Sequence, residues 1–135
     1  MAGNGPLVLL CSPELMLAVR VENAAAALGY RLRSAASPDE AATAVAAERP
    51  AAALLDLAAI GDRLTETLAA LRGSEPAPFL LGFFPHVQRE LGAAGRAAGC
   101  SLVVPRSRFM AELPALLRQA VEGQASTAAM PGGQE

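Results

Sequence analysis

Five short segments of strand character alternate with longer segments whose apolar residues recur at helical spacing, and this alternation restricts the possible folds more than any other feature. The short segments are residues 7–11, 31–35, 51–57, 79–84 and 102–104. Strands separated by helical segments of about 10–15 residues are typical of right-handed βαβ crossovers. The sequence therefore predicts an α/β fold, a (βα)5 doubly wound parallel sheet with helices on both faces.

The predicted strands differ in their apolar pattern. Residues 7–11 and 51–57 are almost continuously apolar, which is typical of strands covered on both faces. Residues 31–35 alternate polar and apolar side chains, which indicates a strand exposed on one face, at the edge of the sheet. The third strand also contains a single acid, Asp56, near its end.

Two proline-containing motifs mark helix starts. Residues 12–14 (Ser-Pro-Glu) predict a first helix with Ser12 as its N-cap and Pro13 at the first helical position. Residues 37–40 (Ser-Pro-Asp-Glu) predict a capping box, in which a serine and a glutamate three residues later bond each other's backbone. The second helix then runs to Arg49 and ends before Pro50.

The later helices show weaker patterns. A third helix is predicted at residues 64–71 after a loop, and a last one at 109–121, where Pro114 predicts a kink or a restart. The two glycines at 92 and 95 sit in a helical pattern and predict a tightly packed helix rather than a phosphate loop. The fourth helix has a narrow apolar stripe, consisting of Val87, Leu91, Ala94 and Ala98.

Length and composition indicate one domain. The 135 residues, 53% of them hydrophobic, divide into an N-terminal tail (1–5), a domain (6–122) and a C-terminal tail (123–135) that is predicted to be disordered. No apolar run reaches the ~18–20 residues that span a bilayer, and no signal segment is evident, so we expect a cytoplasmic protein and no membrane partner. The net charge of −2 argues against direct nucleic-acid binding. Cys11 and Cys100 form no metal motif and no expected disulfide.

Chemistry in an open parallel sheet collects at the carboxyl ends of the strands. The residues to consider there come from four of the predicted strands. They are Cys11 and Ser12, Asp56, Phe83 to His86, and Pro105 to Arg108.

Residues 50–57, which end on Asp56 and Leu57, resemble the third strand of a response-regulator receiver domain of the CheY-like kind. Gly29 and Tyr30 also fall where such domains carry a glycine and an aromatic residue. The resemblance covers about residues 5–122. It implies the receiver strand order 2-1-3-4-5 and makes Asp56 the phosphoacceptor-like residue.

The sequence departs from the receiver pattern at the other polar positions. Cys11 and Ser12 stand where receivers place an acid pair that helps to hold magnesium, and Phe83 stands at the serine or threonine switch position. The chain has no lysine, so the lysine of the fifth strand is absent, and Arg106 is the possible cation or phosphate partner. Phosphoryl transfer depends on these charge-neutralising parts. The resemblance therefore implies a degenerate receiver, a pseudo-receiver, in which Asp56 is solvated or pairs with Arg106.

Three functions follow as hypotheses. The leading one is a stand-alone receiver-like signalling or regulatory module that acts through protein–protein interaction, with no enzymatic activity, no cofactor and no metal. The alternative is a phosphorylatable single-domain response regulator in a two-component phosphorelay, with Asp56 as phosphoacceptor and magnesium as cofactor. A small α/β enzyme is the third, but no nucleophile–base pair supports it; His86, the only histidine, is expected at the surface.

The charges are unevenly distributed. Residues 1–82 hold six arginines and nine acids, whereas residues 83–121 hold five arginines and two acids. In receivers the surface of the fourth helix, fifth strand and fifth helix docks partners, and here it carries the positive half. We expect a partner face that is met by an acidic protein or a second copy of the chain; the alternative is a merely solvated surface. Its residues are Arg89, Arg96, Arg106 and Arg108.

Phe83 and Phe84 allow two interpretations. They could fill the space that the missing polar groups leave in the site, or they could form an exposed docking patch. We favour the first, because apolar side chains fill such a space favourably.

Overall fold

The computed structural model describes residues 5–129, and it contains one five-stranded sheet with the order β2-β1-β3-β4-β5, all neighbours being parallel. This confirms the predicted fold class and strand order. The strands are β1 (Leu7–Cys11), β2 (Arg31–Ala35), β3 (Ala52–Asp56), β4 (Phe79–Phe84) and β5 (Leu102–Pro105).

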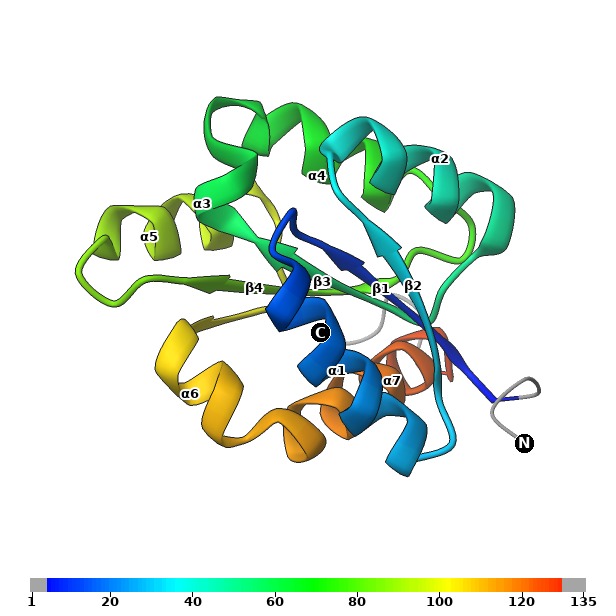
Figure 1. The fold of residues 1–135 in the computed structure, drawn as a ribbon. Helices are drawn as coiled ribbons and strands as arrows, with labels where there is room; N and C mark the ends of the chain where they lie inside the picture. The colour runs from blue at the N-terminus through cyan, green and yellow to red at the C-terminus, as the bar shows by residue number, and fades with distance from the viewer. Residues whose placement is uncertain (1–4, 130–135) are drawn as a thin grey trace.

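Helices cover both faces of the sheet (Figure 1). One face packs against α2, α3, α4 and α5, and the other packs against α1, α6 and α7. Their bounds are α1 (Leu15–Ala27), α2 (Pro38–Glu48), α3 (Leu57–Ile60), the 3₁₀ turn η2 (Gly61–Arg63), α4 (Leu64–Arg72), α5 (Arg89–Ala98), α6 (Arg106–Ala111) and α7 (Leu113–Ala129).

Side-chain alternation along the central strands separates the two cores. In β1, Leu9 and Cys11 enter the core under α2 and α4, whereas Val8 and Leu10 enter the core under α1 and α7. All five β1 residues are buried, as the continuous apolar run predicted. Most of β2 is exposed, which confirms that this strand lies at an edge.

The second helix begins as the sequence predicted. Ser37 Oγ accepts a hydrogen bond from the backbone N–H of Glu40 at 3.2 Å, and Glu40 Oε1 accepts one from the N–H of Ala36 at 2.9 Å. The first helix does not. It begins at Leu15, two residues later than predicted, with Glu14 at the N-cap; the Ser12 hydroxyl accepts from the N–H of Glu14, which precedes the helix, and so caps none of the helical N–H groups.

Two expectations about the middle helices are wrong in detail. The loop predicted before residue 64 is the short helix α3 followed by η2, because the Asp56 side chain caps α3. In α5 the buried positions are Gly92 and Gly95, whereas Val87 precedes the helix and is 76% exposed. Phe84 packs so closely over Gly92 that a Cβ there would lie 2.7 Å from its ring.

The last helical segment is divided, as Pro114 predicted. α6 ends at Ala111, and α7 restarts at Leu113 with Pro114 in its first turn. α7 continues to Ala129, past residue 123 where a disordered tail was predicted to begin; Gln124 Nε2 donates to the carbonyl of Ala77 at 2.9 Å and holds this end of the helix. The rest of that predicted tail and most of the N-terminal tail lie outside the described residues. Among the helices of residues 5–129, none is long and apolar enough to cross a membrane.

Candidate functional site at the carboxyl ends of the strands

Asp56 is the last residue of β3, and its carboxylate is buried, with 9% of the residue exposed. It is also the N-cap of α3. Its Oδ1 accepts a hydrogen bond from the backbone N–H of Ala59 at 3.3 Å, which satisfies one of the unpaired donors at the start of that helix. One carboxylate oxygen is therefore used in holding the β3–α3 junction.

Ser12 binds the other oxygen. Its hydroxyl donates to Asp56 Oδ2 at 2.8 Å and accepts from the backbone N–H of Glu14 at 3.2 Å. Both Ser12 and Asp56 are buried. The hydroxyl therefore connects the end of β1 to the end of β3.

Cys11 does not face Asp56 across this edge, because its side chain enters the core beneath α2. Burial, reinforced by the negative charges of Asp56 and Glu40, raises the pKa of the Cys11 thiol to about 11. Burial also raises the pKa of the Cys100 thiol to about 11. Both cysteines are free, and at neutral pH both are protonated thiols, which are poor nucleophiles and poor metal ligands.

Arg106 does not pair with Asp56, and Asp56 is not solvated; both parts of that interpretation are wrong. The Nη2 atom of Arg106 lies 2.7 Å from Glu14 Oε1 and 2.8 Å from Glu14 Oε2. This ion pair joins the loop after β1 to the start of α6. Because both side chains are partly exposed, the ion pair contributes little to stability, about 0–1 kcal/mol. It does engage the Arg106 guanidinium, which the sequence predicted as the cation near Asp56.

Phe83 is the register neighbour of Asp56 in the adjacent strand, and 1% of it is exposed. Its ring stacks on the ring of Phe109 from α6, with centroids 4.4 Å apart and planes 12° apart. Phe84 points into the opposite core and is 6% exposed. The interpretation of these two residues as an exposed docking patch is therefore wrong.

A magnesium ion, which the receiver resemblance implies, requires several hard oxygen ligands in near-octahedral geometry. The residues at this edge do not fit it. Both carboxylate oxygens of Asp56 already accept hydrogen bonds from the protein, and the Glu14 carboxylate is paired with Arg106. Within residues 5–129, no three His, Cys, Asp or Glu side chains are grouped so that they could hold a metal ion.

The predicted partner face lies on both sides of the edge strand β5. Arg89 and Arg96 belong to α5, whereas Arg106 and Arg108 belong to α6 on the other face of the sheet. Arg108 pairs with Glu112 at 3.2 Å. Arg89 and Arg96 are exposed and form no ion pair with any described residue, so they carry most of the unneutralised charge of this face.

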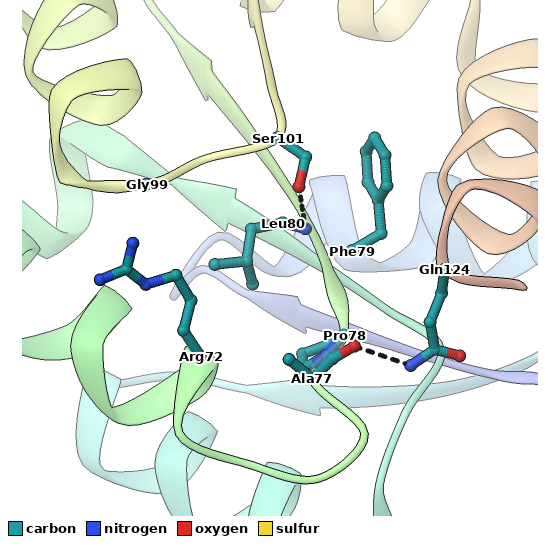
Figure 2. A pocket seen from close by; sticks show the side chains of 8 residues that line it. All are labelled: Arg72, Ala77, Pro78, Phe79, Leu80, Gly99, Ser101 and Gln124. Carbon is teal, nitrogen blue, oxygen red and sulfur yellow. Dashed lines mark hydrogen bonds between the residues drawn. The ribbon is translucent and has the colours of Figure 1, made fainter. Parts of the chain in front are cut away.

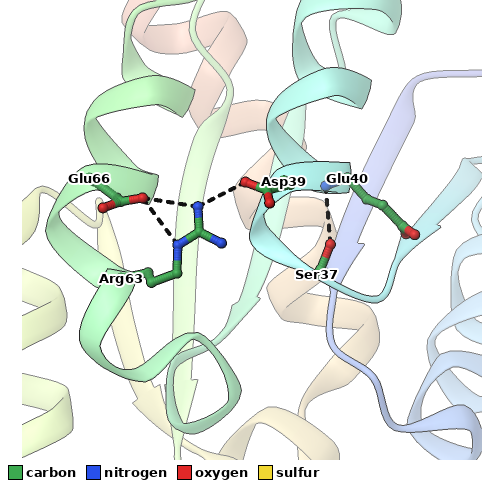
Figure 3. Close-up of polar contacts among 5 residues, drawn as sticks. All are labelled: Ser37, Asp39, Glu40, Arg63 and Glu66. Carbon is green, nitrogen blue, oxygen red and sulfur yellow. Dashed lines mark hydrogen bonds and ion pairs between the residues drawn. The ribbon is translucent and has the colours of Figure 1, made fainter.

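Two further polar side chains near this end of the sheet are His86 and Arg63. His86 is exposed just after β4, as predicted. Arg63, which the sequence did not single out, donates to Asp39 at 2.8 Å and to Glu66 at 2.9 and 3.1 Å, and it joins the start of α2 to the start of α4 (Figure 3). The hydrogen bond and charge of Arg63 lower the pKa of Asp39. The sequence could have predicted only the pair of Arg63 with Glu66, which lie at the helical spacing of three residues, and not the pair of Arg63 with Asp39.

Comparisons with known proteins agree with this fold. No family model matches the sequence, and no curated protein matches it. Among solved structures, the signal receiver domain of an HD domain-containing protein from Pseudomonas fluorescens Pf-5 is 19% identical, with a TM-score of 0.79 and coverage of 94% of both chains. A receiver domain protein (CheY-like) from Methanospirillum hungatei JF-1 is 17% identical, with a TM-score of 0.76 and coverage of 91% of this chain and 98% of the other.

A third structure is similar in the same way. The receiver domain of NtrX from Brucella abortus is 20% identical, has a TM-score of 0.73, and is matched over 98% of its length by 85% of this chain. At these identities the likeness establishes the fold, which is that of response-regulator receiver domains.

Proposed function

We propose that this chain is a receiver-like signalling or regulatory module that acts through protein–protein interaction and has no enzymatic activity. In this proposal Asp56 is not phosphorylated through the usual magnesium-dependent chemistry. The observation that carries it is the 2.8 Å hydrogen bond from Ser12 to Asp56 Oδ2, made by a hydroxyl at a position where receivers place an acid.

Electrostatics support the proposal. Transfer of a phosphoryl group needs cations that neutralise the charge developing on its oxygens. The chain has no lysine, and the guanidinium of Arg106 is bound to Glu14. A phosphoryl group on Asp56 would also displace one of the two hydrogen bonds that the carboxylate accepts.

We expect no phosphorylation of the chain by acetyl phosphate with magnesium, because the metal ligands and the neutralising cation are lacking. Intact mass spectrometry measures the modification, and amide chemical shifts after addition of beryllofluoride and magnesium measure binding of the phosphoryl analogue. An established receiver domain treated identically is the positive control. Stoichiometric modification that disappears in Asp56→Asn would contradict the proposal and favour a phosphorylatable response regulator.

The proposed interaction uses the face around α5 and α6, whose partner is an acidic protein or a second copy of the chain. Arg89 and Arg96 supply exposed charge without internal partners among the described residues. Exposed charges of one sign steer association and are screened by salt. On a second copy, the single cation of Arg63 offsets only part of the acidic charge at the starts of α2 and α4, which therefore keep a net negative charge that complements these arginines.

Reversal of both charges, Arg89→Glu with Arg96→Glu, is expected to weaken self-association at low salt at least several-fold, because attraction becomes repulsion. Sedimentation velocity at low and high salt measures it. The matched control is Arg31→Glu with Arg118→Glu, which reverses two exposed charges on β2 and α7. If the dimers are unchanged by the double substitution on α5, this face is not the interface between copies. If the wild-type chain is monomeric at low and high salt, a second copy is not the partner.

A further inference from the structure

A cavity of about 320 Å³ opens at the amino ends of β4 and β5, at the opposite edge of the sheet from Asp56 (Figure 2). It lies between the end of α4, the turn before β5 and α7. Its size is at the lower end of small-molecule sites, which are roughly 300–1,000 Å³. Its principal lining residues are Arg72, Pro78, Phe79, Gly99, Ser101 and Gln124.

The walls of this cavity are fixed by hydrogen bonds. The backbone N–H of Ser101 donates to the carbonyl of Leu80 at 2.7 Å, and the Ser101 hydroxyl accepts from the N–H of Leu80 at 3.4 Å. Gln124 Nε2 donates to the carbonyl of Ala77 at 2.9 Å. The Ser101 hydroxyl proton remains available to a ligand.

Phe79 gives the cavity an apolar surface. Its ring is half-buried and packs so closely on α7 that no side chain fits at Gly123. Pro78 extends the apolar surface beside it. An apolar or aromatic ligand body would therefore meet a preformed wall.

Arg72 supplies the charge. Its guanidinium lies against the backbone of Gly99, where it leaves no space for a Cβ. It forms no ion pair and no side-chain hydrogen bond with any residue of the described range 5–129. Its N–H donors therefore remain available for a planar oxyanion, which a guanidinium binds with two parallel hydrogen bonds.

We propose that this cavity binds a small organic acid, whose carboxylate or phosphate is held by Arg72 and Ser101 and whose apolar or aromatic body packs on Phe79 and Pro78. The site is separate from Asp56 and from the arginines of α5 and α6. It therefore adds a small-molecule input to a module whose proposed function is protein interaction, and it does not depend on that function.

Titration of the full chain with benzoate and with phenyl phosphate, followed by amide chemical shifts, tests the proposal. We expect saturable shifts centred on residues 77–80 and 99–101 with at least one of these probes. Benzyl alcohol lacks the charge and inorganic phosphate lacks the apolar body, so each should bind at least about tenfold more weakly than the best probe. Preference for benzoate assigns a carboxylate ligand, and preference for phenyl phosphate assigns a phosphate ester.

Arg72→Gln is expected to weaken the best probe about tenfold or more, because it removes a charge-assisted pair of hydrogen bonds. Arg118→Gln, an exposed arginine on α7, is the matched control and should bind normally. Arg72 is exposed at the end of α4, so the variant should keep the wild-type spectrum away from the cavity. Equal affinity of wild type and Arg72→Gln, shifts centred elsewhere, or no saturation at tens of millimolar of either acid would overturn the proposal.

Discussion

Replacement of Phe83 by alanine is expected to lower the free energy of unfolding by about 3–5 kcal/mol, the usual cost of truncating a buried aromatic residue. Phe83 is 1% exposed, and its ring stacks on Phe109. The truncation removes that contact and leaves a cavity between β4 and α6. Urea unfolding followed by circular dichroism measures the change.

Two further variants test whether the loss of stability comes from the buried position of Phe83 or would follow the loss of any aromatic ring. Phe79→Ala should cost markedly less than Phe83→Ala, because Phe79 is only half-buried and borders an open cavity. Phe83→Leu should retain most of the stability, because it keeps most of the apolar volume. If Phe83→Ala and Phe79→Ala destabilise the chain equally, the stack on Phe109 does not have the importance assigned to it.

The sequence predicted the features that depend on local chemistry. The buried run at residues 7–11, the edge strand at 31–35 and the capping box at Ser37 all form as expected. Each depends on side-chain period or on contacts between residues a few positions apart. The strand order came from the resemblance to receivers, because periodicity alone does not say which strands are neighbours.

The partners of side chains at the site could not be predicted in the same way. Ser12 looked like a helix cap and Arg106 like a partner of Asp56, but Ser12 bonds Asp56 and Arg106 bonds Glu14. These contacts join the loop after β1 to segments that are distant in sequence, so no local sequence pattern predicts them. The close packing of α5 at Gly92 and Gly95 was predicted, but its buried face was placed on an apolar stripe that includes Val87, because glycines give no apolar signal.

The polar groups at the carboxyl edge are paired with one another. The oxygens of Asp56 accept from Ser12 and Ala59, and the charge of Arg106 is matched by Glu14. A buried carboxylate with satisfied oxygens is stable without a metal, because its hydrogen bonds offset the cost of desolvation. The exposed arginines of α5 and the guanidinium of Arg72 form no ion pair with a described residue, which leaves their charges available for the interactions proposed above.

Replacement of Gly82 by valine is expected to destabilise the protein by about 3 kcal/mol or more, because overpacking at this position cannot be relieved easily. Gly82 is buried in β4 between β3 and β5. A Cβ there would lie 3.0 Å from both terminal methyl groups of Leu57 and 3.1 Å from the sulfur of Cys100. Urea unfolding measures the loss. Gly73→Val is the control, because a Cβ at Gly73 meets its neighbours at 3.5 Å, and it should change stability by less than about 1 kcal/mol.

The double variant with Leu57→Ala identifies the cause. Leu57 is fully buried, so Leu57→Ala alone should cost about 2–5 kcal/mol through the cavity it leaves. That cavity lies where the valine side chain at position 82 needs space. The double variant should therefore lose at least about 1 kcal/mol less than the two single losses combined. Additive losses would show that Leu57 is not what limits the size of residue 82, and the close approach of α3 to β4 would not explain the glycine.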